Sequence, residues 1–535
     1  ISNSGVAQNT SGAAPNITGK IVTKSGEAVS GASVTVKGTR NTVTTNENGE
    51  FSILTGNGET LVISSIGFAQ QEIRIGNSTN NLHVALSDDY SNLQDVVVVG
   101  YGTMKKTDMS SSQVTVTAED IEKTVNTTFD QALQGRAANV YVSSPSGQPG
   151  AAPSVVIRGL SSLTGSTQPL YVIDGVQIKP DNPSADDPYN HPSGYANILS
   201  GINPDDIATV NILQGPSATA IYGSAGANGV ILISTKRGKI GETKINVSTL
   251  WTMQDRPAYI PVMNLPQYAA YRNEVEKAGG TATDPTFADP SVLGNGTNWQ
   301  NALFSRTLLQ KHQMSFSGGN DKTTFYVSGE YFNQQGIAPG SGFSRGSLRM
   351  NLDNQTRSWL KIGTQLSVNQ TQEKVNTTNA GIIQLAIAQN PSVPVKNADG
   401  SWGGPANTQF QFSNPIALAN INNDHNKSMA FIGGMNADIT FMKGLVFHNE
   451  VNGSFQYYNN YQFHPGYNFN GYIVPNTSAT STRAASNNYW WNFNSRLQYD
   501  TKIGKHGITA MIAHESQAWE NEGLSGSRTG YVVYD

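Results

Sequence analysis

The sequence predicts a mainly β protein in which a small β-sandwich, an α+β domain and the first part of an antiparallel barrel follow one another. Glycine occupies 54 of the 535 positions, and charged residues make up only 13% of the chain. Asn, Ser, Thr and Tyr are abundant, which is typical of β-rich proteins with polar, uncharged surfaces. Short strand patterns recur in the first 87 residues, and long patterns of two-residue alternation fill the second half.

Charge and cysteine content exclude several classes of function. The formal net charge is −4, and no cluster of lysine and arginine alternates with aromatic residues, so no nucleic-acid partner is predicted. The chain has no cysteine, which excludes disulfides, thiolate metal sites and cysteine nucleophiles. No run of about 18 apolar residues exists, but a transmembrane β-barrel stays open because its strands carry a weaker signal. The start lacks the features of a secretory signal, and we expect such a signal to have been removed.

Residues 17–87 are predicted to form the sandwich, after an N-terminal extension over residues 1–16. Val34 and Val36 face one way, and the polar residues between and after them face the other. Turns such as "NENGE" supply the Asn and Gly that tight reversals need. The stretch "GKIVTKSGEAVSGASVTVKGT" resembles the carboxypeptidase regulatory-like domain, an immunoglobulin-like sandwich.

Residues 88–114 form a linker that contains the unusual stretch "LQDVVVVGYGTMKK". Four consecutive valines are consistent with an additional strand of the sandwich. They are also consistent with a strand offered to another protein, because an extended apolar segment with free backbone donors and acceptors is a template for strand addition. Gly100 and Gly102 would let such a segment detach, and we favour this second interpretation.

Residues 115–237 are predicted to form a compact α+β domain. "PSVVIRGLSS", "PLYVIDGVQI" and "VILIST" have strand patterns, and Asn203 followed by Pro204 is a helix-start signal. The glycine-rich "GSAGANG" lacks the Lys-Ser/Thr ending of a phosphate loop, so we interpret it as a helix cap and a tight turn. A second helix is indicated by a capping pair followed by apolar residues at every fourth position: Thr117 with Asp120, then Ile121, Val125, Phe129 and Leu133.

Residues 238–535 have the pattern of long barrel strands. Leu445, Phe447 and Val451 fall on one face of a strand, and Asn452 and Gln456 fall on the other. A soluble sandwich also alternates in this way. Strand length, aromatic residues near strand ends and long polar loops such as residues 373–425 favour a membrane barrel.

Several motifs, in their order, resemble SusC-like TonB-dependent transporters of the SusC/RagA type. They are "VVVVGYGTMKKTDMSSSQVTV", "VVIRGLSS", "PLYVIDGV" and "INPDDIATVNILQGPSATAIYGSAGANGVILISTKRGK". The resemblance implies a plug over residues 115–237 and a barrel of about 22 strands in the full protein. Residues 238–535 supply only about ten strands. Because an open half-barrel would expose unpaired edges to lipid, the chain looks like the front part of a longer protein.

The resemblance also implies the site residues, the partners and the location. The Ton box, recognised by TonB, would be Asp95, Val96, Val97, Val98 and Val99. The plug motifs would include Arg158, Gly159, Asp174, Gly175, Tyr222 and Gly223. Outer-membrane lipid and a SusD-like surface lipoprotein are further expected partners, in the bacterial outer membrane. The expected function is import of an oligomeric nutrient, a glycan first and a peptide as the alternative, and a surface adhesin without transport is a more distant alternative.

No enzyme activity, cofactor or metal is predicted. His514 and Glu515 lack the second histidine of a zinc motif, and the other histidines are scattered. The loop "DNPSADDPYNHP" holds Asp181, Asp186 and Asp187, but it lacks regular calcium-ligand spacing. Trp490 and Trp491 are candidates for sugar stacking or for the interfacial aromatic girdle, which we favour. The sequence does not locate the substrate pocket.

Overall fold

The chain forms two compact units, Ile1–Ser110 and Ser111–Asp535. The structure, a computed structural model, describes residues 16–531 apart from these positions: 24–25, 40, 57, 66–67, 77–80, 87–95, 100–101, 106–112, 125–126, 145, 152, 161–166, 179–197, 216–218, 257, 405–411, 468–477 and 505.

The described part of the first unit contains the predicted sandwich, with a three-stranded sheet (order β4-β1-β7) and a four-stranded sheet (order β3-β2-β5-β6). Ile21, Val34, Leu61 and Ile63 are fully buried between the sheets, as the alternation predicts. The strands are β1 (Asn16–Thr23), β2 (Ser33–Val36), β3 (Thr42–Thr44), β4 (Glu50–Leu54), β5 (Thr60–Ser65), β6 (Phe68–Arg74) and β7 (Leu82–Leu86).

The plug domain is built on a sheet of order β10-β15-β16-β13-β14, five-stranded over the described residues, with β11 and β12 as a separate pair. Its apolar core includes Phe129, Leu133, Tyr171 and Ile212. The strands are β10 (Gln113–Thr117), β11 (Val140–Ser143), β12 (Ser154–Ile157), β13 (Leu170–Ile173), β14 (Val176–Ile178), β15 (Ile207–Leu213) and β16 (Val230–Thr235).

The helices of the plug domain are shorter than the sequence pattern indicated. Thr117 and Asp120 form the predicted capping box, but α1 spans only Ala118–Glu122. Phe129 and Leu133 are buried without continuing that helix, since the β-branched residues between them and α1 disfavour helix. Asn203 likewise caps a single turn before β15 begins. The 3-10 turns are η3 (Gln131–Leu133), η4 (Ile198–Gly201), η5 (Pro204–Asp206) and η6 (Ala220–Gly226).

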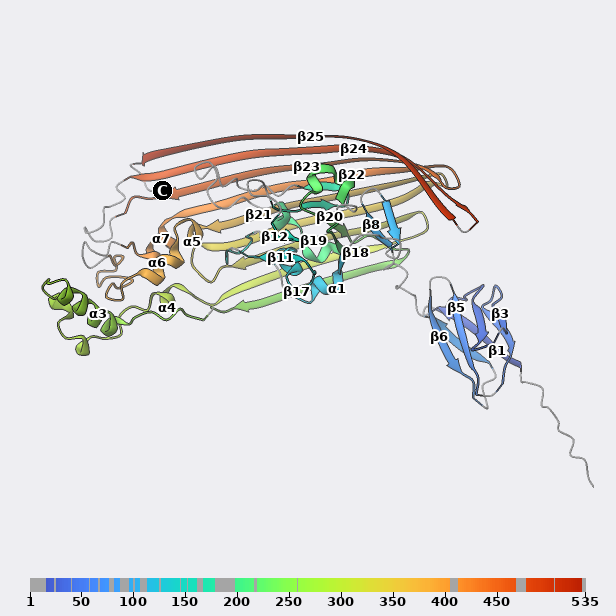
Figure 1. Ribbon diagram of the computed structural model, residues 1–535, viewed down its shortest axis with the longest axis horizontal. Helices are drawn as coiled ribbons and strands as arrows, with labels where there is room; N and C mark the ends of the chain where they lie inside the picture. Colours follow the sequence, from blue (N-terminus) through green and yellow to red (C-terminus); the bar gives the residue numbers. More distant parts are fainter. Residues whose placement is uncertain are drawn as a thin grey trace, which may run out of the picture. The chain divides into compact units, whose positions relative to one another are not determined.

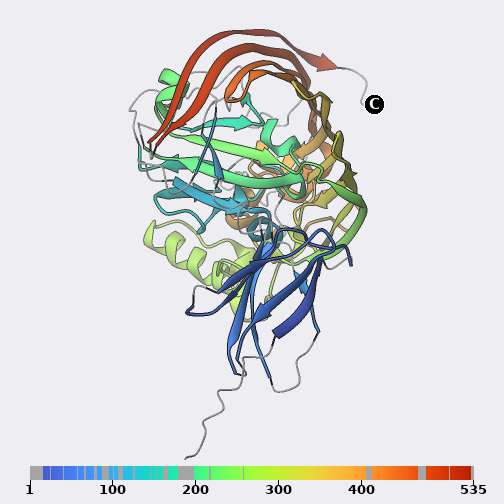
Figure 2. The ribbon, with the colours of Figure 1, turned by 90° about the vertical axis from the view of Figure 1, so that its right-hand side faces the viewer.

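The rest of the second unit is an antiparallel meander in which, over the described ranges, nine strands pair in sequence order from β17 to β25. About ten strands were expected. The long strands lie side by side in Figure 1, and they curve around the plug domain in Figure 2. The strands are β17 (Gly241–Gln254), β18 (Thr307–Gly319), β19 (Thr323–Gln335), β20 (Ser341–Arg357), β21 (Leu360–Val375), β22 (Asn423–Met442), β23 (Leu445–His464), β24 (Ala479–Ile503) and β25 (His506–Tyr531).

The two faces of this sheet differ as the alternation predicts. On the outer face, Val451 is 53% exposed and Trp491 is 49% exposed. On the inner face, Asn452 and Asn492 are almost fully buried. Trp490 corrects the sequence-based interpretation, because it packs into the core of the plug domain and so is neither a girdle residue nor a sugar platform.

Two connections at one end of the sheet are long, whereas those at the other end are short. Residues 255–306 and 376–422 contain short helices that share an apolar core, so the predicted polar loop around 373–425 is in fact a folded structure. No helix within the described ranges is both long and apolar enough to cross a membrane. The helices and turns at this end are α3 (Leu265–Ala278), η7 (Pro285–Phe287), η8 (Pro290–Val292), α4 (Trp299–Leu303), α5 (Asn376–Asn379), α6 (Ile382–Ala388) and α7 (Pro415–Ile421).

Candidate functional site

Strand β20 carries a row of polar side chains that contact the plug domain. Successive side chains of a strand point to opposite faces, so every second residue of β20 faces inward. Four such residues, separated by even numbers of positions, each contact plug residues: Arg345, Arg349, Asn351 and Asp353. We call this row the β20 rail.

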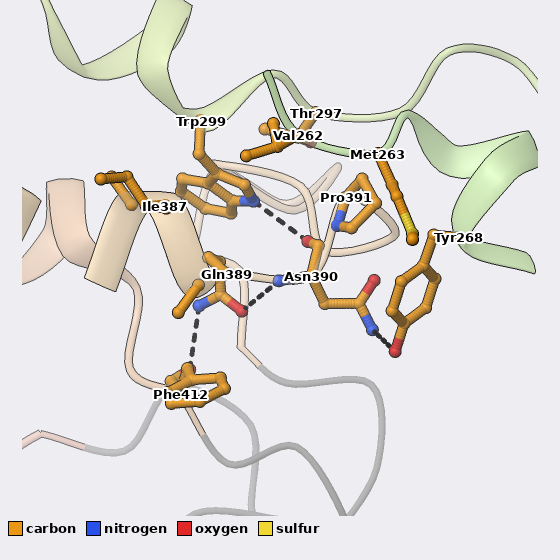
Figure 3. A pocket seen from close by; sticks show the side chains of 12 residues that line it. Val262, Met263, Tyr268, Thr297, Trp299, Ile387, Gln389, Asn390, Pro391 and Phe412 are labelled. Carbon is orange, nitrogen blue, oxygen red and sulfur yellow. Dashed lines mark hydrogen bonds between the residues drawn. The ribbon is translucent and has the colours of Figure 1, made fainter. Parts of the chain in front are cut away.

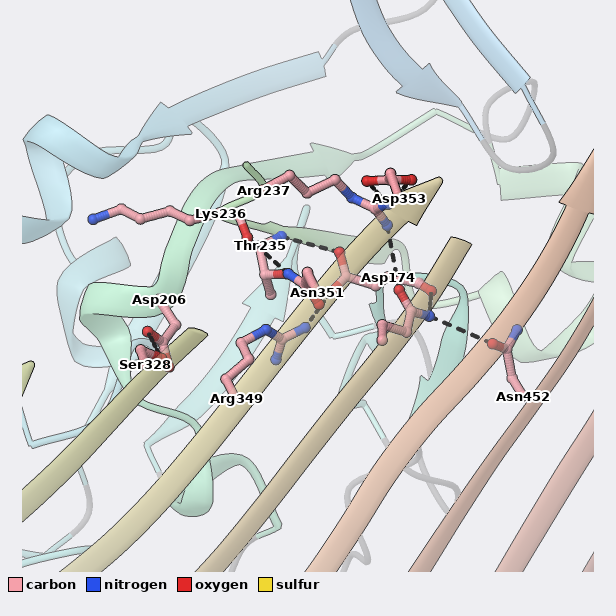
Figure 4. A network of polar contacts seen from close by, with 11 residues as sticks. Asp174, Asp206, Thr235, Lys236, Arg237, Ser328, Arg349, Asn351, Asp353 and Asn452 are labelled. Atoms are coloured by element: carbon pink, nitrogen blue, oxygen red, sulfur yellow. Dashed lines mark hydrogen bonds and ion pairs between the residues drawn. The ribbon is translucent and has the colours of Figure 1, made fainter. Parts of the chain in front are cut away.

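The plug residue at the centre of the rail is Asp174. Its carboxylate accepts hydrogen bonds from the backbone N–H (3.0 Å) and the hydroxyl (2.6 Å) of Thr235, and it forms an ion pair with Arg349. The side-chain amide of Gln365 on β21 donates to the backbone carbonyl of Asp174 (2.5 Å). Figure 4 shows Arg349 and Thr235 converging on Asp174. The Asp174 carboxylate is therefore bound from both the plug and the barrel.

Asp174 and Gly175 form the turn of the hairpin between β13 and β14, although the pattern of "PLYVIDGVQI" predicted a single strand. Both residues have positive φ values, 46° and 91°, and Asp-Gly is a favoured pair for a two-residue hairpin turn. A Cβ at Gly175 would lie 2.6 Å from Oε1 of Glu450 on β23, so glycine also allows close approach to the barrel.

Neighbouring contacts extend the rail along the last plug strand. The side-chain amide of Asn351 donates to the Thr235 hydroxyl (2.9 Å) and to the backbone carbonyl of Lys236 (2.7 Å). Arg237 pairs with Asp353 at 3.2 Å, and its guanidinium also donates to Gln365 (3.3 Å). These contacts attach the chain where it leaves the plug domain for β17.

The other end of the rail is a buried guanidinium. Arg345 binds both oxygens of Glu330 at 2.8 and 3.0 Å, and both side chains are fully buried. The same guanidinium donates to the backbone carbonyls of Thr127 (3.0 Å) and Ser200 (2.7 Å), two plug segments far apart in sequence. Arg345 thus joins two parts of the plug domain to the barrel wall.

Asp206 is a further buried plug carboxyl that meets the barrel. It accepts hydrogen bonds from the hydroxyls of Tyr326 (2.8 Å) and Ser328 (2.6 Å) on β19. Burial raises the pKa of Asp206, and these hydroxyl donors oppose that rise. Beside it, Lys311 of β18 pairs with Asp205 at 2.7 Å. Plug attachment is therefore largely polar, although Ile432 and Trp490 of the barrel join the plug's apolar core.

The three predicted pairs of plug residues occupy different places. Arg158, with φ 59°, and Gly159 follow β12, and Arg158 donates to the backbone carbonyl of Gln214 inside the plug (3.2 Å). Tyr222 packs against a small apolar cluster beside a kink at Gly223, and burial raises the pKa of its hydroxyl. Asp174 and Gly175 lie against the barrel wall, as described above.

The barrel side of the site was not predicted from the sequence. The sequence does show polar residues on one face of this strand: Arg345, Arg349, Asn351 and Asp353. That pattern is a signal for a polar inner face, but it does not say which plug residues each one meets.

The predicted Ton box lies partly within the described residues. Val96–Val99 form strand β8, which pairs antiparallel with β9 (Gly102–Lys105), and Asp95 lies outside the described residues. In the described part of the chain, β8 and β9 form a sheet of their own, so the alternative of an additional sandwich strand is not what the structure has.

A cavity of about 200 Å³ lies among the folded connections that contain α3, α4 and α6. Figure 3 shows its polar groups bonded to one another. The Trp299 indole donates to the backbone carbonyl of Asn390 (3.0 Å), the Asn390 amide donates to the Tyr268 hydroxyl (2.9 Å), and Gln389 donates to the backbone carbonyl of Phe412 (3.0 Å). These bonds hold the connections together around the cavity.

The described residues contain no group of three metal-ligating side chains. The aspartates of the predicted calcium loop, Asp181, Asp186 and Asp187, lie outside the described residues. An α+β domain held by polar contacts inside a curved antiparallel sheet with an apolar outer face defines the class of plugged barrel proteins.

Comparisons with known proteins agree with this class. Residues 105–230 match the TonB-dependent Receptor Plug Domain, and residues 17–98 match the CarboxypepD_reg-like domain. TonB-dependent receptor P26 of Formosa agariphila is 33% identical over 500 residues, which cover 91% of this chain and 48% of that protein. TonB-dependent receptor SusC of Bacteroides thetaiotaomicron is 31% identical over 508 residues, which cover 90% and 48%.

A solved structure of the RagAB peptide importer in its open-open state has the same fold, with a TM-score of 0.69 and 23% identity. The match covers 82% of this chain and 50% of that one. This chain therefore spans about half the length of the relatives that it matches. It belongs to the SusC/RagA type of TonB-dependent receptors, which lie in the bacterial outer membrane.

Proposed function

We propose that the protein imports an oligomeric nutrient across the outer membrane, and that force applied through TonB displaces the plug domain. The β20 rail is the observation that carries this proposal. Hydrogen bonds and ion pairs can be exchanged for bonds to water, whereas separating a large apolar interface would expose that surface to water. A plug held largely by polar contacts is therefore suited to repeated release and return.

The Ton box is proposed to be Asp95 and the strand Val96–Val99. Its support is the extended backbone of β8 and its place ahead of the plug domain. Extended segments bind partners by adding a strand to a sheet, with the backbone supplying the hydrogen bonds. Energy would reach the plug through this contact, so the import needs no nucleotide site in this chain.

The orientation of the barrel follows from the lengths of its connections. Barrels of this class have short periplasmic turns and longer extracellular loops. The connections 320–322, 358–359 and 443–444 are short, whereas 255–306 and 376–422 are long. The end that bears α3 to α7 is therefore proposed to face the outside of the cell, and the cavity in Figure 3 lies at that end.

A glycan is the cargo that we propose first. The inner face of β22 to β24 carries uncharged amides and hydroxyls that bond to one another, and such groups also suit a polyhydroxylated cargo. Asn460 donates to Asn426 (2.7 Å), and Gln456 donates to the hydroxyl of Ser428 (3.0 Å). A peptide is the second candidate, because the Asp424–His464 pair adds charge to the same wall and a structural relative is described as a peptide importer.

A SusD-like surface lipoprotein is the proposed partner at the outer end. Tyr271 and Val275 lie four residues apart on α3 and are 51% and 45% exposed, and Val262 and Met263 before this helix are also exposed. Apolar side chains gathered in this way mark interaction surfaces. The substitutions Tyr271→Glu and Val275→Glu should reduce co-purification of the lipoprotein, whereas Lys277→Glu on the same helix should not. Mass spectrometry of the native complex would identify both the lipoprotein and the bound cargo.

Plug displacement can be tested with a reversible disulfide crosslink between the plug domain and the barrel. A Cβ at Gly201 of the plug would lie 2.5 Å from Cγ of Asn369 on β21, which suits a disulfide between cysteines at these positions. Residues 1–535 contain no native cysteine. We expect the full-length Gly201→Cys/Asn369→Cys protein to bind cargo normally, to lose uptake when oxidised, and to regain it when reduced.

The matched control joins two barrel strands instead. Gly363 of β21 and Asn436 of β22 are directly paired, so a disulfide between cysteines there leaves the plug unattached. Uptake by this control should be the same before and after reduction. Normal uptake by the oxidised Gly201→Cys/Asn369→Cys protein would contradict transport by plug displacement.

A further inference from the structure

The Ton box candidate is one strand of a two-stranded hairpin. Val96 pairs with Lys105, Val97 with Met104, Val98 with Thr103 and Val99 with Gly102. Within the described residues β8 has no other partner strand, so β9 covers one of its edges and leaves the second edge without a partner.

The two open edges of the hairpin differ in chemistry. Strand β8 consists of valines alone, whereas β9 contains Lys105 and is followed by Lys106. Lysine on an edge strand disfavours pairing with another chain, and a hydrophobic edge without charge invites it. A two-stranded hairpin is also only marginally stable in water, so a third strand stabilises it. The edge of β8 is therefore the preferred place for strand addition.

Holding the Ton box in this hairpin changes the free energy of binding. A flexible segment loses conformational entropy when a partner orders it, and that loss weakens binding. A segment already held as an extended strand has lost part of this entropy before the partner arrives, so it binds more tightly.

We propose that β9 is a built-in template that holds the Ton box extended, and that TonB adds a third strand at the open edge of β8. This inference rests on the proposed function, since it takes Val96–Val99 to be the TonB-binding segment. It goes further by giving β9 a role in that binding and by choosing the edge that TonB uses.

The register indicates which backbone groups form hydrogen bonds within the hairpin and which point to its open edges. The pairing of Val99 with Gly102 leaves a two-residue connection, the length of a β-turn in which the first carbonyl accepts from the fourth N–H. Hydrogen-bonded and non-bonded pairs alternate along an antiparallel ladder. On this basis we expect Val97 and Met104 to form a bonded pair, and the backbone groups of Val98 and Thr103 to point away from the hairpin.

The test uses proline, which removes a backbone donor, in full-length protein titrated with the purified periplasmic domain of TonB. Met104→Pro removes a donor that we expect to bond β9 to β8. It should weaken TonB binding about five- to tenfold, the effect of one typical hydrogen bond. Thr103→Pro is the matched control, because its donor points away from β8, and it should weaken binding less than Met104→Pro does.

A second variant changes the hairpin in the opposite direction. The pair Gly100→Asn and Tyr101→Gly places Asn-Gly in the connection, the sequence that two-residue hairpins favour. Binding should tighten by about threefold, and amide hydrogen exchange over residues 96–105 should slow, as expected when a local element becomes more stable.

If β9 instead competes with TonB for β8, the changes in affinity should be reversed. Met104→Pro should then bind TonB more tightly, and the Asn-Gly variant should bind it more weakly. That result would overturn the inference, and so would unchanged affinity in both. Val98→Pro separates this failure from failure of the proposed function, because it removes a donor from the open edge. If Val98→Pro and Val97→Pro, which removes the donor facing β9, both bind TonB as well as wild type does, the assignment of the Ton box itself is wrong.

Discussion

Asp174, in a hairpin turn of the plug domain, is paired with Arg349 of strand β20, and the two side chains are only 5% and 6% exposed. The residues lie 175 positions apart in the chain. The carboxylate also accepts two hydrogen bonds from Thr235, so the Asp174 side of this buried ion pair is held by additional bonds. The relationship makes Asp174 the best position at which to test plug attachment.

Asp174→Asn should weaken attachment of the plug domain to the barrel. Removing one partner leaves the Arg349 charge buried without its counter-ion, which typically costs about 3–5 kcal/mol. In full-length protein we expect protease to cleave the plug at a lower urea concentration than in wild type. The control is Glu72→Gln in the exposed Lys37–Glu72 pair, which should change stability by less than about 1 kcal/mol. Equal urea dependence of Asp174→Asn and wild type would contradict a role for this pair in attachment.

The stability of the plug domain should depend on the protonation of Asp130. Burial raises the pKa of this carboxyl to about 8, and the hydroxyl of Tyr171 opposes the rise only in part. The folded state therefore holds a proton that the unfolded state releases near pH 4. Stability should fall as the pH rises from about 4 to about 8, by at most roughly 1.4 kcal/mol per pH unit, and stay level above that window.

Asp130→Asn removes this titration while keeping the shape of the side chain. We expect the variant to be more stable than wild type at pH 8, and the difference between the two to shrink as the pH is lowered to 5. Thermal unfolding of the plug at a series of pH values measures it. A constant difference between variant and wild type across that range would contradict the raised pKa.

The outer face of the barrel is tested at Val451, which is 53% exposed and lies within β23. If this residue faces lipid near the middle of the membrane, Val451→Arg should cost about 2–4 kcal/mol. Val451→Leu, which stays apolar, should cost under about 1 kcal/mol. The measurement is reversible unfolding of the full-length protein in lipid vesicles. Equal costs for the two variants would show that the residue does not face lipid.

The sandwich should fold by itself. A fragment over residues 16–87 contains a complete buried core, and small domains usually unfold in one cooperative transition. Leu61 is fully buried, so Leu61→Ala should cost about 2–5 kcal/mol. Leu54 is 59% exposed, so Leu54→Ala should change stability by less than about 0.5 kcal/mol. A wild-type fragment with no amide dispersion in its NMR spectrum would refute independent folding.

Features that depend on near neighbours in the chain were predictable from the sequence. Two-residue alternation placed Val451 outside and Asn452 inside, because successive side chains of a strand point to opposite faces. The caps at Thr117 and Asn203 were predictable because a capping side chain bonds to backbone two or three residues ahead. The family motifs identified the plug domain for the same reason, since each is a short continuous stretch.

Features that depend on distant parts of the chain were decided by the tertiary structure alone. Nothing local to Asp174 indicates Arg349, because their contact requires the register of the barrel strands and the docking of the plug domain together. The residues that flank Trp490 in the sequence resemble those around an interfacial tryptophan. Its side chain lies on the inner face of the sheet, however, and so it packs into the core of the plug domain. The sequence by itself determined which residues face inward. The tertiary structure determined what each of them meets, because the partners come from chain segments that only the complete packing brings together.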